Sequence, residues 1–138
     1  MTVLDAYAVV AYLAGGPAAP RVRELLRAGD AVVATANLAE ALDVTERLYG
    51  LPVARAFEHL EPLLDGTITP VVLDVDTARR AAMLRARHYD RNRCRISMAD
   101  AILLASAGAA GRIATADPDV LAVAEAEGTG TTPLPGQG

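Results

Sequence analysis

The chain has 138 residues, of which 52% are hydrophobic and 22% are charged, and its formal net charge is −4. This length fits one domain that can bury its own core, and no window approaches the ~18 uninterrupted apolar residues of a membrane span. A single cysteine and two histidines exclude an internal disulfide and a cysteine-rich zinc site, and they give little support to a zinc hydrolase.

Short apolar runs alternate along the chain with longer segments of helical period. The runs, which predict β-strands, are residues 2–4, 31–34, 68–72 and 112–115. The helical segments are residues 6–13, 18–28, 36–49, 53–64, 75–90, 97–111 and 117–128. This alternation predicts an α/β fold, namely a single three-layer domain with a central, mainly parallel β-sheet flanked by helices.

Two of these segments carry more specific expectations. In residues 75–90 the helical period gives Ala82, Met83 and Leu84 as the buried face. Residues 129–138 are rich in turn-forming residues and are expected to pack only loosely. The domain is therefore assigned to residues 1–135 and a disordered tail to residues 136–138.

Four acidic residues occupy corresponding places in the predicted elements. Asp5 and Asp117 each stand between a strand and a helix, whereas Glu40 and Asp100 lie one turn into helices. In an open α/β sheet, ligands bind beyond the carboxyl ends of the strands. We therefore expect these four acids to converge at one edge of the sheet.

Helix capping is the favoured explanation for each of these acids when it is taken singly. Asp5 and Asp117 have the position of N-caps, and Ser97 with Asp100 has the spacing of a capping box, as does Asn37 with Glu40. Position alone also nominates too many acids, because Asp74 and Asp76 likewise follow a strand and open a helix.

Asp5 and Asp100 differ from the other acids in the apolar sequence around them. Several uncompensated anions near a core would repel one another, and a divalent cation relieves that repulsion. Carboxylates without histidine or thiol partners suit Mg²⁺ or Mn²⁺. Such an ion activates water and stabilises negative charge on a phosphoryl group.

Four stretches of the sequence together resemble the PIN-domain family, and most closely its VapC-type toxins of bacterial toxin–antitoxin pairs. They are VLDAYAVVAYL (3–13), NLAEALDV (37–44), ISMADAILLASA (96–107) and IATADP (113–118). The resemblance extends from Val3 to about Pro135, with the motifs in the family's order. It implies a PIN-like fold and a metal-dependent endoribonuclease toxin that hydrolyses RNA phosphodiester bonds with Mg²⁺ or Mn²⁺.

The resemblance also implies roles for individual residues. The metal-binding and catalytic acids would be Asp5, Glu40, Asp100 and Asp117. Thr115 matches the small polar residue of the family's TxD element, Asp119 is a candidate to assist through water, and Asn37 stands near the place of the family's serine or threonine. The implied partners are RNA, a cognate VapB-type antitoxin that blocks the acidic pocket, and a second copy of the chain in a homodimer.

The charge pattern bears on nucleic-acid binding in two opposite ways. A net charge of −4 is unlike a typical nucleic-acid binder, yet seven of the thirteen arginines lie within residues 79–95. They would either guide a phosphate backbone or face solvent and pair with acids. Arg93 and Arg95, in a loop-like stretch before Asp100, are the expected RNA-binding residues.

Two alternative functions can be compared with a nuclease. A catalytically weak PIN-like module that binds RNA or protein would need the same fold without the hydrolysis. A receiver domain or a haloacid-dehalogenase-like phosphatase is disfavoured because these families use a lysine and this chain has none. The N-terminal segment does not resemble a secretion signal, so we expect a cytoplasmic protein without membrane contact.

Overall fold

A computed structural model describes residues 1–136, and within that range the chain forms seven helices and five strands. The strands are β1 (Thr2–Leu4), β2 (Ala31–Ala34), β3 (Ile68–Val71), β4 (Arg112–Thr115) and β5 (Gly130–Pro133). The helices are α1 (Ala6–Ala14), α2 (Ala19–Ala28), α3 (Thr35–Tyr49), α4 (Val53–Leu60), α5 (Val75–His88), α6 (Met98–Ala107) and α7 (Pro118–Glu127). None of these helices is both long and apolar enough to cross a bilayer.

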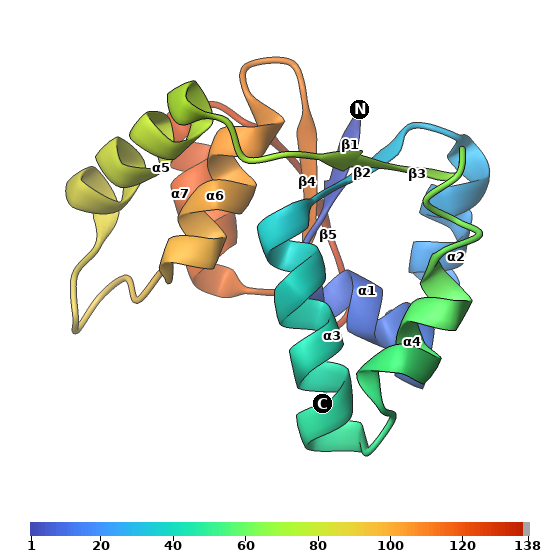
Figure 1. Cartoon of the computed structure of the whole chain (residues 1–138). Helices are drawn as coiled ribbons and strands as arrows, with labels where there is room; N and C mark the ends of the chain where they lie inside the picture. Colours follow the sequence, from blue (N-terminus) through green and yellow to red (C-terminus); the bar gives the residue numbers. More distant parts are fainter. Residues whose placement is uncertain (137–138) are drawn as a thin grey trace.

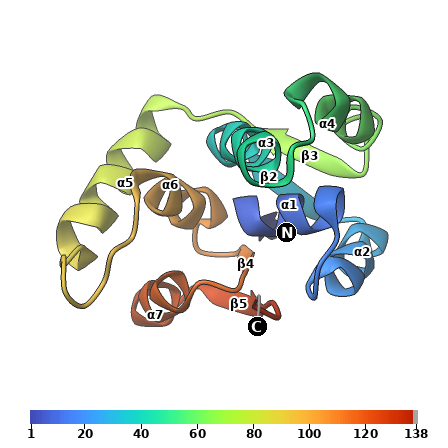
Figure 2. The same ribbon diagram turned by 90° about the horizontal axis from the view of Figure 1, so that it is seen from below.

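The five strands form one sheet in the order β3-β2-β1-β4-β5, and every neighbouring pair is parallel. The predicted α/β fold with a central parallel sheet is therefore confirmed. Because the strands are parallel, their carboxyl ends meet at one edge, and α1, α3 and α7 begin there (Figures 1 and 2). This edge is where the predicted acids should converge.

Alternating residues of the strands pack into two cores on opposite faces of the sheet. Val3, Val32 and Ile113 pack against residues of α6 and α7. Leu4 and Val33 belong to the other core, which includes residues of α1, α2 and α4. Helix α6 lies between the sheet and α5, and six of its ten residues are buried. Its nearly all-apolar sequence follows from contact on both sides.

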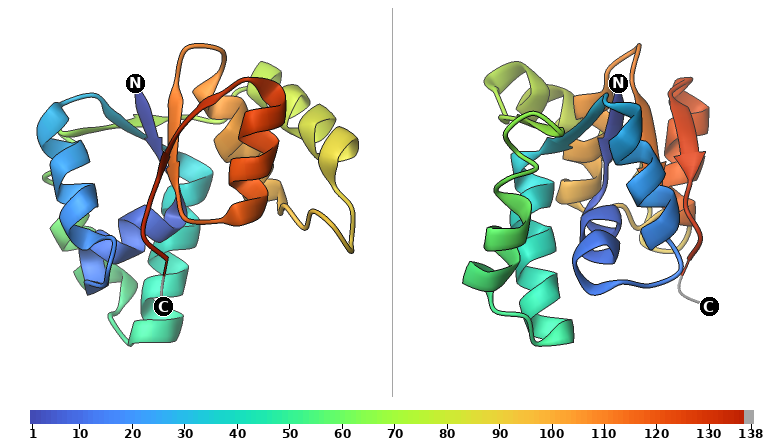
Figure 3. Two further views of the ribbon diagram at one scale, coloured as in Figure 1. Left: turned by 180° about the vertical axis from the view of Figure 1, so that it is seen from behind. Right: turned by 90° about the vertical axis from the view of Figure 1, so that its right-hand side faces the viewer.

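The expectation of a loosely packed segment after α7 is wrong for residues 130–135. The chain turns back at Gly128, whose φ of 74° is left-handed, and β5 then pairs with β4 at the edge of the sheet (Figure 3). Leu134 is buried in the core, and its N–H donates to the Thr115 carbonyl at 2.8 Å. Of the tail assigned to residues 136–138, residues 137 and 138 lie outside the described range.

The expected buried face of α5 is confirmed only for Leu84, which is half-buried against the core. Ala82 and Met83 are exposed, whereas Thr77 and Ala81 are buried. The Asp74 carboxylate accepts the Thr77 N–H at 2.7 Å and thereby fixes where the helix starts. With that start, Ala81 packs against Ala101, Ile102 and Ala105 of α6, whereas Met83 is half-exposed.

Candidate active site

The four predicted acids line one hollow at the carboxyl edge of the sheet. The hollow has a volume of about 350 Å³. Its lining residues are Asp5, Ala6, Tyr7, Asn37, Glu40, Asp100, Ala116, Asp117 and Gly136. The four carboxylates come from separate segments of the chain, because Asp5 follows β1, Glu40 lies in α3, Asp100 lies in α6 and Asp117 follows β4. We call this hollow the acidic pocket.

Asp5 is the most deeply placed of these acids, with 8% of its surface exposed. It caps α1, since its Oδ1 accepts the Ala8 N–H at 2.8 Å. Burial raises its pKa to about 6, and the nearby charges of Asp100 and Asp117 act in the same direction against a hydrogen bond from Thr115. A carboxylate held under these conditions is poised for a compensating cation.

Asp100 forms the predicted capping box at the start of α6. Its Oδ2 accepts the Ser97 N–H at 2.9 Å, and the Ser97 hydroxyl accepts the Asp100 N–H at 3.0 Å. Burial raises the pKa of Asp100, and the charges of Asp117 and Asp119 raise it further. The hydrogen bonds with Ser97 lower this pKa without cancelling the effect of burial, so capping leaves the charge of the carboxylate only partly compensated.

Glu40 and Asn37 reach the pocket from within α3. The predicted capping box between them is absent in this described segment, because the helix already begins at Thr35. Burial raises the pKa of Glu40, followed by the charge of Asp100. The Asn37 amide donates to the Ala99 carbonyl at 3.2 Å and so joins α3 to the start of α6.

Thr115 and Asp117 connect the end of β4 to the other acids. The buried Thr115 hydroxyl accepts the Asp117 N–H at 3.1 Å and also hydrogen-bonds to Asp5. Asp117 Oδ1 in turn accepts the Asp119 N–H at 2.8 Å. Asp119 does not line the pocket, and its carboxylate instead accepts the Arg95 N–H at 3.1 Å.

The donor atoms around the pocket suit a hard cation. Across residues 1–136, no three His, Cys, Asp or Glu side chains are already gathered as a metal-binding group. Mg²⁺, however, is commonly held by one or two carboxylates together with water and substrate phosphates. The buried Asn37 Oδ1 has no hydrogen-bond partner in the described part of the chain, so it is an uncommitted oxygen beside the acids. The residues present therefore fit such an ion.

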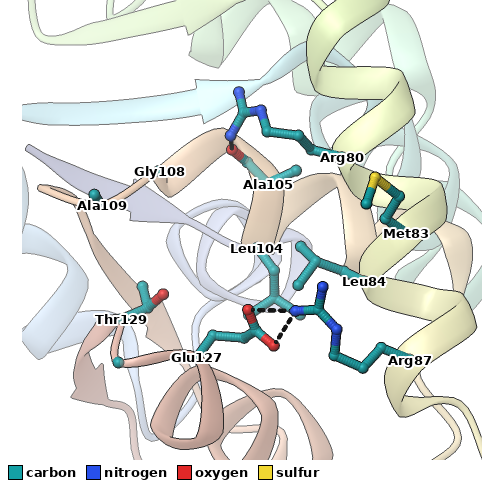
Figure 4. A pocket seen from close by; sticks show the side chains of 11 residues that line it. Arg80, Met83, Leu84, Arg87, Leu104, Ala105, Gly108, Ala109, Glu127 and Thr129 are labelled. Carbon is teal, nitrogen blue, oxygen red and sulfur yellow. Dashed lines mark hydrogen bonds and ion pairs between the residues drawn. The ribbon is translucent and has the colours of Figure 1, made fainter.

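A second hollow, of about 370 Å³, lies at the opposite end of α6, between α5, α6 and α7. Figure 4 shows that its charged side chains are already paired. Arg87 makes two hydrogen bonds to Glu127, at 2.8 and 3.0 Å, and Arg80 donates to the Ala105 carbonyl at 2.9 Å. Because its floor is mainly apolar and its ions are satisfied, we do not assign the chemistry to this hollow.

Four pocket residues were not predicted as part of the site, namely Ala6, Tyr7, Ala116 and Gly136. Tyr7 lines the pocket, and its hydroxyl donates to the Pro135 carbonyl at 2.6 Å. Gly136 is brought there by the same C-terminal segment. The position of Tyr7 two residues after Asp5 was a usable signal, whereas nothing local in the sequence indicated the return of the C-terminus.

Comparisons with known proteins bear on the family and the fold of the chain. Residues 2–126 match the model of the PIN domain. A solved structure described as the crystal structure of FitAcB from Neisseria gonorrhoeae is similar, with a TM-score of 0.66 and 25% sequence identity over 95% of this chain and 96% of that chain. No curated protein matches the chain significantly.

Proposed function

Because the chain belongs to the PIN-domain family, we propose that it is a VapC-type toxin, a metal-dependent endoribonuclease that hydrolyses RNA phosphodiester bonds in the cytoplasm. One observation carries the proposal. Four carboxylates from separate segments line one pocket, and burial and mutual repulsion raise the pKa of three of them, Asp5, Glu40 and Asp100. Clusters of carboxylates with raised pKa values are typical of functional sites, because gathering their charges at neutral pH costs stability.

The side chains divide the proposed work between them. Asp5, Glu40, Asp100 and Asp117 would hold Mg²⁺ or Mn²⁺, which supplies activation of water and stabilisation of charge on the phosphoryl group. Thr115 fixes Asp5 and Asp117 relative to each other through its hydroxyl. Asn37 holds α3 against the start of α6 and so keeps Glu40 and Asp100 at one pocket.

The test replaces acids that share a capping role but differ in position. Asp5→Asn and Asp100→Asn should each lower metal-stimulated RNA cleavage by about 100-fold or more, that is ~3 kcal/mol of transition-state stabilisation. Asp74→Asn is the matched control, because Asp74 also caps a helix after a strand but lies outside the pocket. Cleavage would be measured on labelled RNA with Mn²⁺ or Mg²⁺, and folding by circular dichroism.

Two results would contradict the proposal. Undiminished cleavage by a folded Asp5→Asn/Asp100→Asn double variant would remove the acids from the chemistry. Tight RNA binding without metal-stimulated hydrolysis by the unaltered chain would instead identify a PIN-like binding module.

The proposed partners have a surface available beside the site. An apolar hollow of about 250 Å³ between α1 and α3, lined in part by Val10, Val44 and Leu48, shares Tyr7 and Glu40 with the acidic pocket. A VapB-type antitoxin segment bound there would reach the acids. Coexpression of the product of a neighbouring small open reading frame should then suppress cleavage.

The homodimer is proposed from the family resemblance. Light scattering of the purified chain tests it.

A further inference from the structure

The arginines of residues 79–95 divide into two groups by their partners. Arg79 and Arg80 pair with Asp76, and Arg87 pairs with Glu127. Arg85 donates to the Ile96 carbonyl at 3.1 Å, and its guanidinium lies 4.3 Å from the centre of the Tyr89 ring. The helical arginines are therefore occupied, as Figure 4 illustrates for two of them.

The second group lies in the segment between α5 and α6, residues 89–97, which we call the arginine loop. Arg91, Arg93 and Arg95 are all exposed, and none of them has a carboxylate partner within the described residues. Arg95 uses its Nε to bond the Arg91 carbonyl at 2.9 Å, which leaves the rest of its guanidinium available. The arginine loop thus carries three guanidinium groups without a carboxylate partner among the described residues, in a chain whose net charge is −4.

The arginine loop is held in one conformation despite its lack of helix or strand. Asp90 and Cys94 exchange backbone hydrogen bonds at 2.8 and 2.9 Å, and the Asp90 carboxylate accepts the N–H groups of Asn92 and Arg93. Ile96 is fully buried in the core. A loop anchored in this way loses little conformational entropy when its side chains bind a ligand.

Hydrogen bonds also connect this loop to the acidic pocket. Asp119 accepts the Arg95 N–H through its carboxylate and donates its own N–H to Asp117. At the other end of the loop, Ser97 and Asp100 form the capping box. Figure 1 shows the loop at the lower left, at the same end of the molecule as the starts of α6 and α7.

We propose that the arginine loop binds the phosphates of single-stranded RNA beside the bond to be cut, and that Asp119 is a positioning residue that holds the loop in register with the catalytic acids. This proposal rests on the proposed nuclease function. The arginine loop would offset the repulsion between the acidic pocket and the RNA backbone. A pocket of four carboxylates repels an RNA backbone, and fixed cations next to it hold the flanking phosphates.

The first test measures binding without turnover, by fluorescence anisotropy of labelled single-stranded RNA in EDTA. The variant Arg91→Ala/Arg93→Ala should bind about tenfold more weakly, and the slope of log affinity against log salt should fall by about 1.4 for two lost phosphate contacts. Arg23→Ala/Arg27→Ala on α2 is the matched control, because it removes the same charge from residues without an ion pair in the described chain. Equal losses in both variants would overturn the proposal.

The second test separates positioning from metal binding at Asp119. Asp119→Ala removes the acceptor of the Arg95 N–H and should weaken RNA binding several-fold, whereas Asp119→Asn keeps an acceptor oxygen and should restore binding. The thermal shift induced by Mn²⁺ should be the same in both variants. Weak binding and a lost shift in Asp119→Asn would assign the residue to the metal and overturn its positioning role.

These measurements keep the two proposals apart. Loss of RNA binding in the arginine-loop variant of a chain that does not cleave RNA would support the loop and refute the nuclease. Unchanged binding in that variant of a chain that does cleave RNA would refute the loop alone.

Discussion

The charged groups at the two ends of α6 differ in whether they have partners of opposite charge. At its N-terminal end, four carboxylates line the acidic pocket, and none of them forms an ion pair within residues 1–136. At its C-terminal end, Glu127 pairs with Arg87 at 2.8 Å and forms a hydrogen bond with the His88 ring at 2.5 Å. Matched charges stabilise helix packing and need nothing further, whereas unmatched buried charges indicate a missing partner.

The largest expected difference between the two ends is in how stability depends on pH. The pKa of Asp5 in the folded protein is about 6, against 3.8 for the ordinary side chain, so the folded state binds the proton more tightly than the unfolded state. Its contribution is favourable below pH 4 and is lost as the pH rises through 6, which amounts to about 3 kcal/mol. Urea unfolding of metal-free protein at pH 4.5 and pH 7.5 would measure about 2 kcal/mol of this loss, because at pH 4.5 most unfolded chains already carry an ionised Asp5.

Asp5→Asn is the variant that isolates this effect. It removes the titrating group but keeps an oxygen for the Ala8 N–H, so it should be more stable than the unaltered chain at pH 7.5 and about equal at pH 4.5. Equal stabilities of the two proteins at both pH values would show that the buried charge carries no cost.

A somewhat smaller effect is expected from adding the metal. An ion at a concentration 100 times its Kd stabilises the folded state by about 2.7 kcal/mol, which for a domain of this size raises the Tm by about 10 °C. We expect this shift with Mn²⁺ for the unaltered chain and for Glu127→Gln, and its loss in Asp100→Asn. Differential scanning fluorimetry would measure the change in Tm. A full increase in the Tm of Asp100→Asn would show that the ion binds elsewhere.

The smallest expected effect on stability is at the C-terminal end of α6, where Glu127 is paired. Hydrogen bonds from His88 and Arg87 lower the pKa of Glu127, so its favourable contribution is present above pH 4.5 and is lost as the pH falls through the lowered value. Because Arg87 is more than half exposed, Glu127→Gln should cost only about 1 kcal/mol of unfolding free energy at pH 7. Its cleavage rate should equal that of the unaltered chain, and a slower rate would show that the two ends of α6 communicate.

The sequence predicted those parts of the fold that depend on local pattern. The parallel sheet, the seven helices and the capping roles of Asp5, Asp100 and Asp117 all follow from periodicity and from residues at helix starts. The place of β5 did not follow, because a strand of glycine, threonine and proline forms only where the edge of β4 is available to pair with it. That long-range pairing also brings Gly136 to the pocket.

The same distinction applies to the site. Joint pattern nominated the four acids, but spacing gave no sign that the Asp119 carboxylate accepts the Arg95 N–H, 24 residues away. The arginines show the converse. The sequence placed Arg93 and Arg95 in a loop-like stretch, but it gave no sign of which arginines are neutralised, and the fold shows ion pairs for Arg79, Arg80 and Arg87.

The hydrogen bonds at Asp5, Asp100 and Asp117 have an evolutionary consequence. Each carboxylate uses one oxygen to accept an N–H at a helix start. Asparagine offers an oxygen to the same N–H without the charge, so one base change in an aspartate codon can remove a charge from the pocket and keep the helix cap. If the proposed function holds, a single mutational step would separate an active nuclease from an inactive binding protein with the same fold.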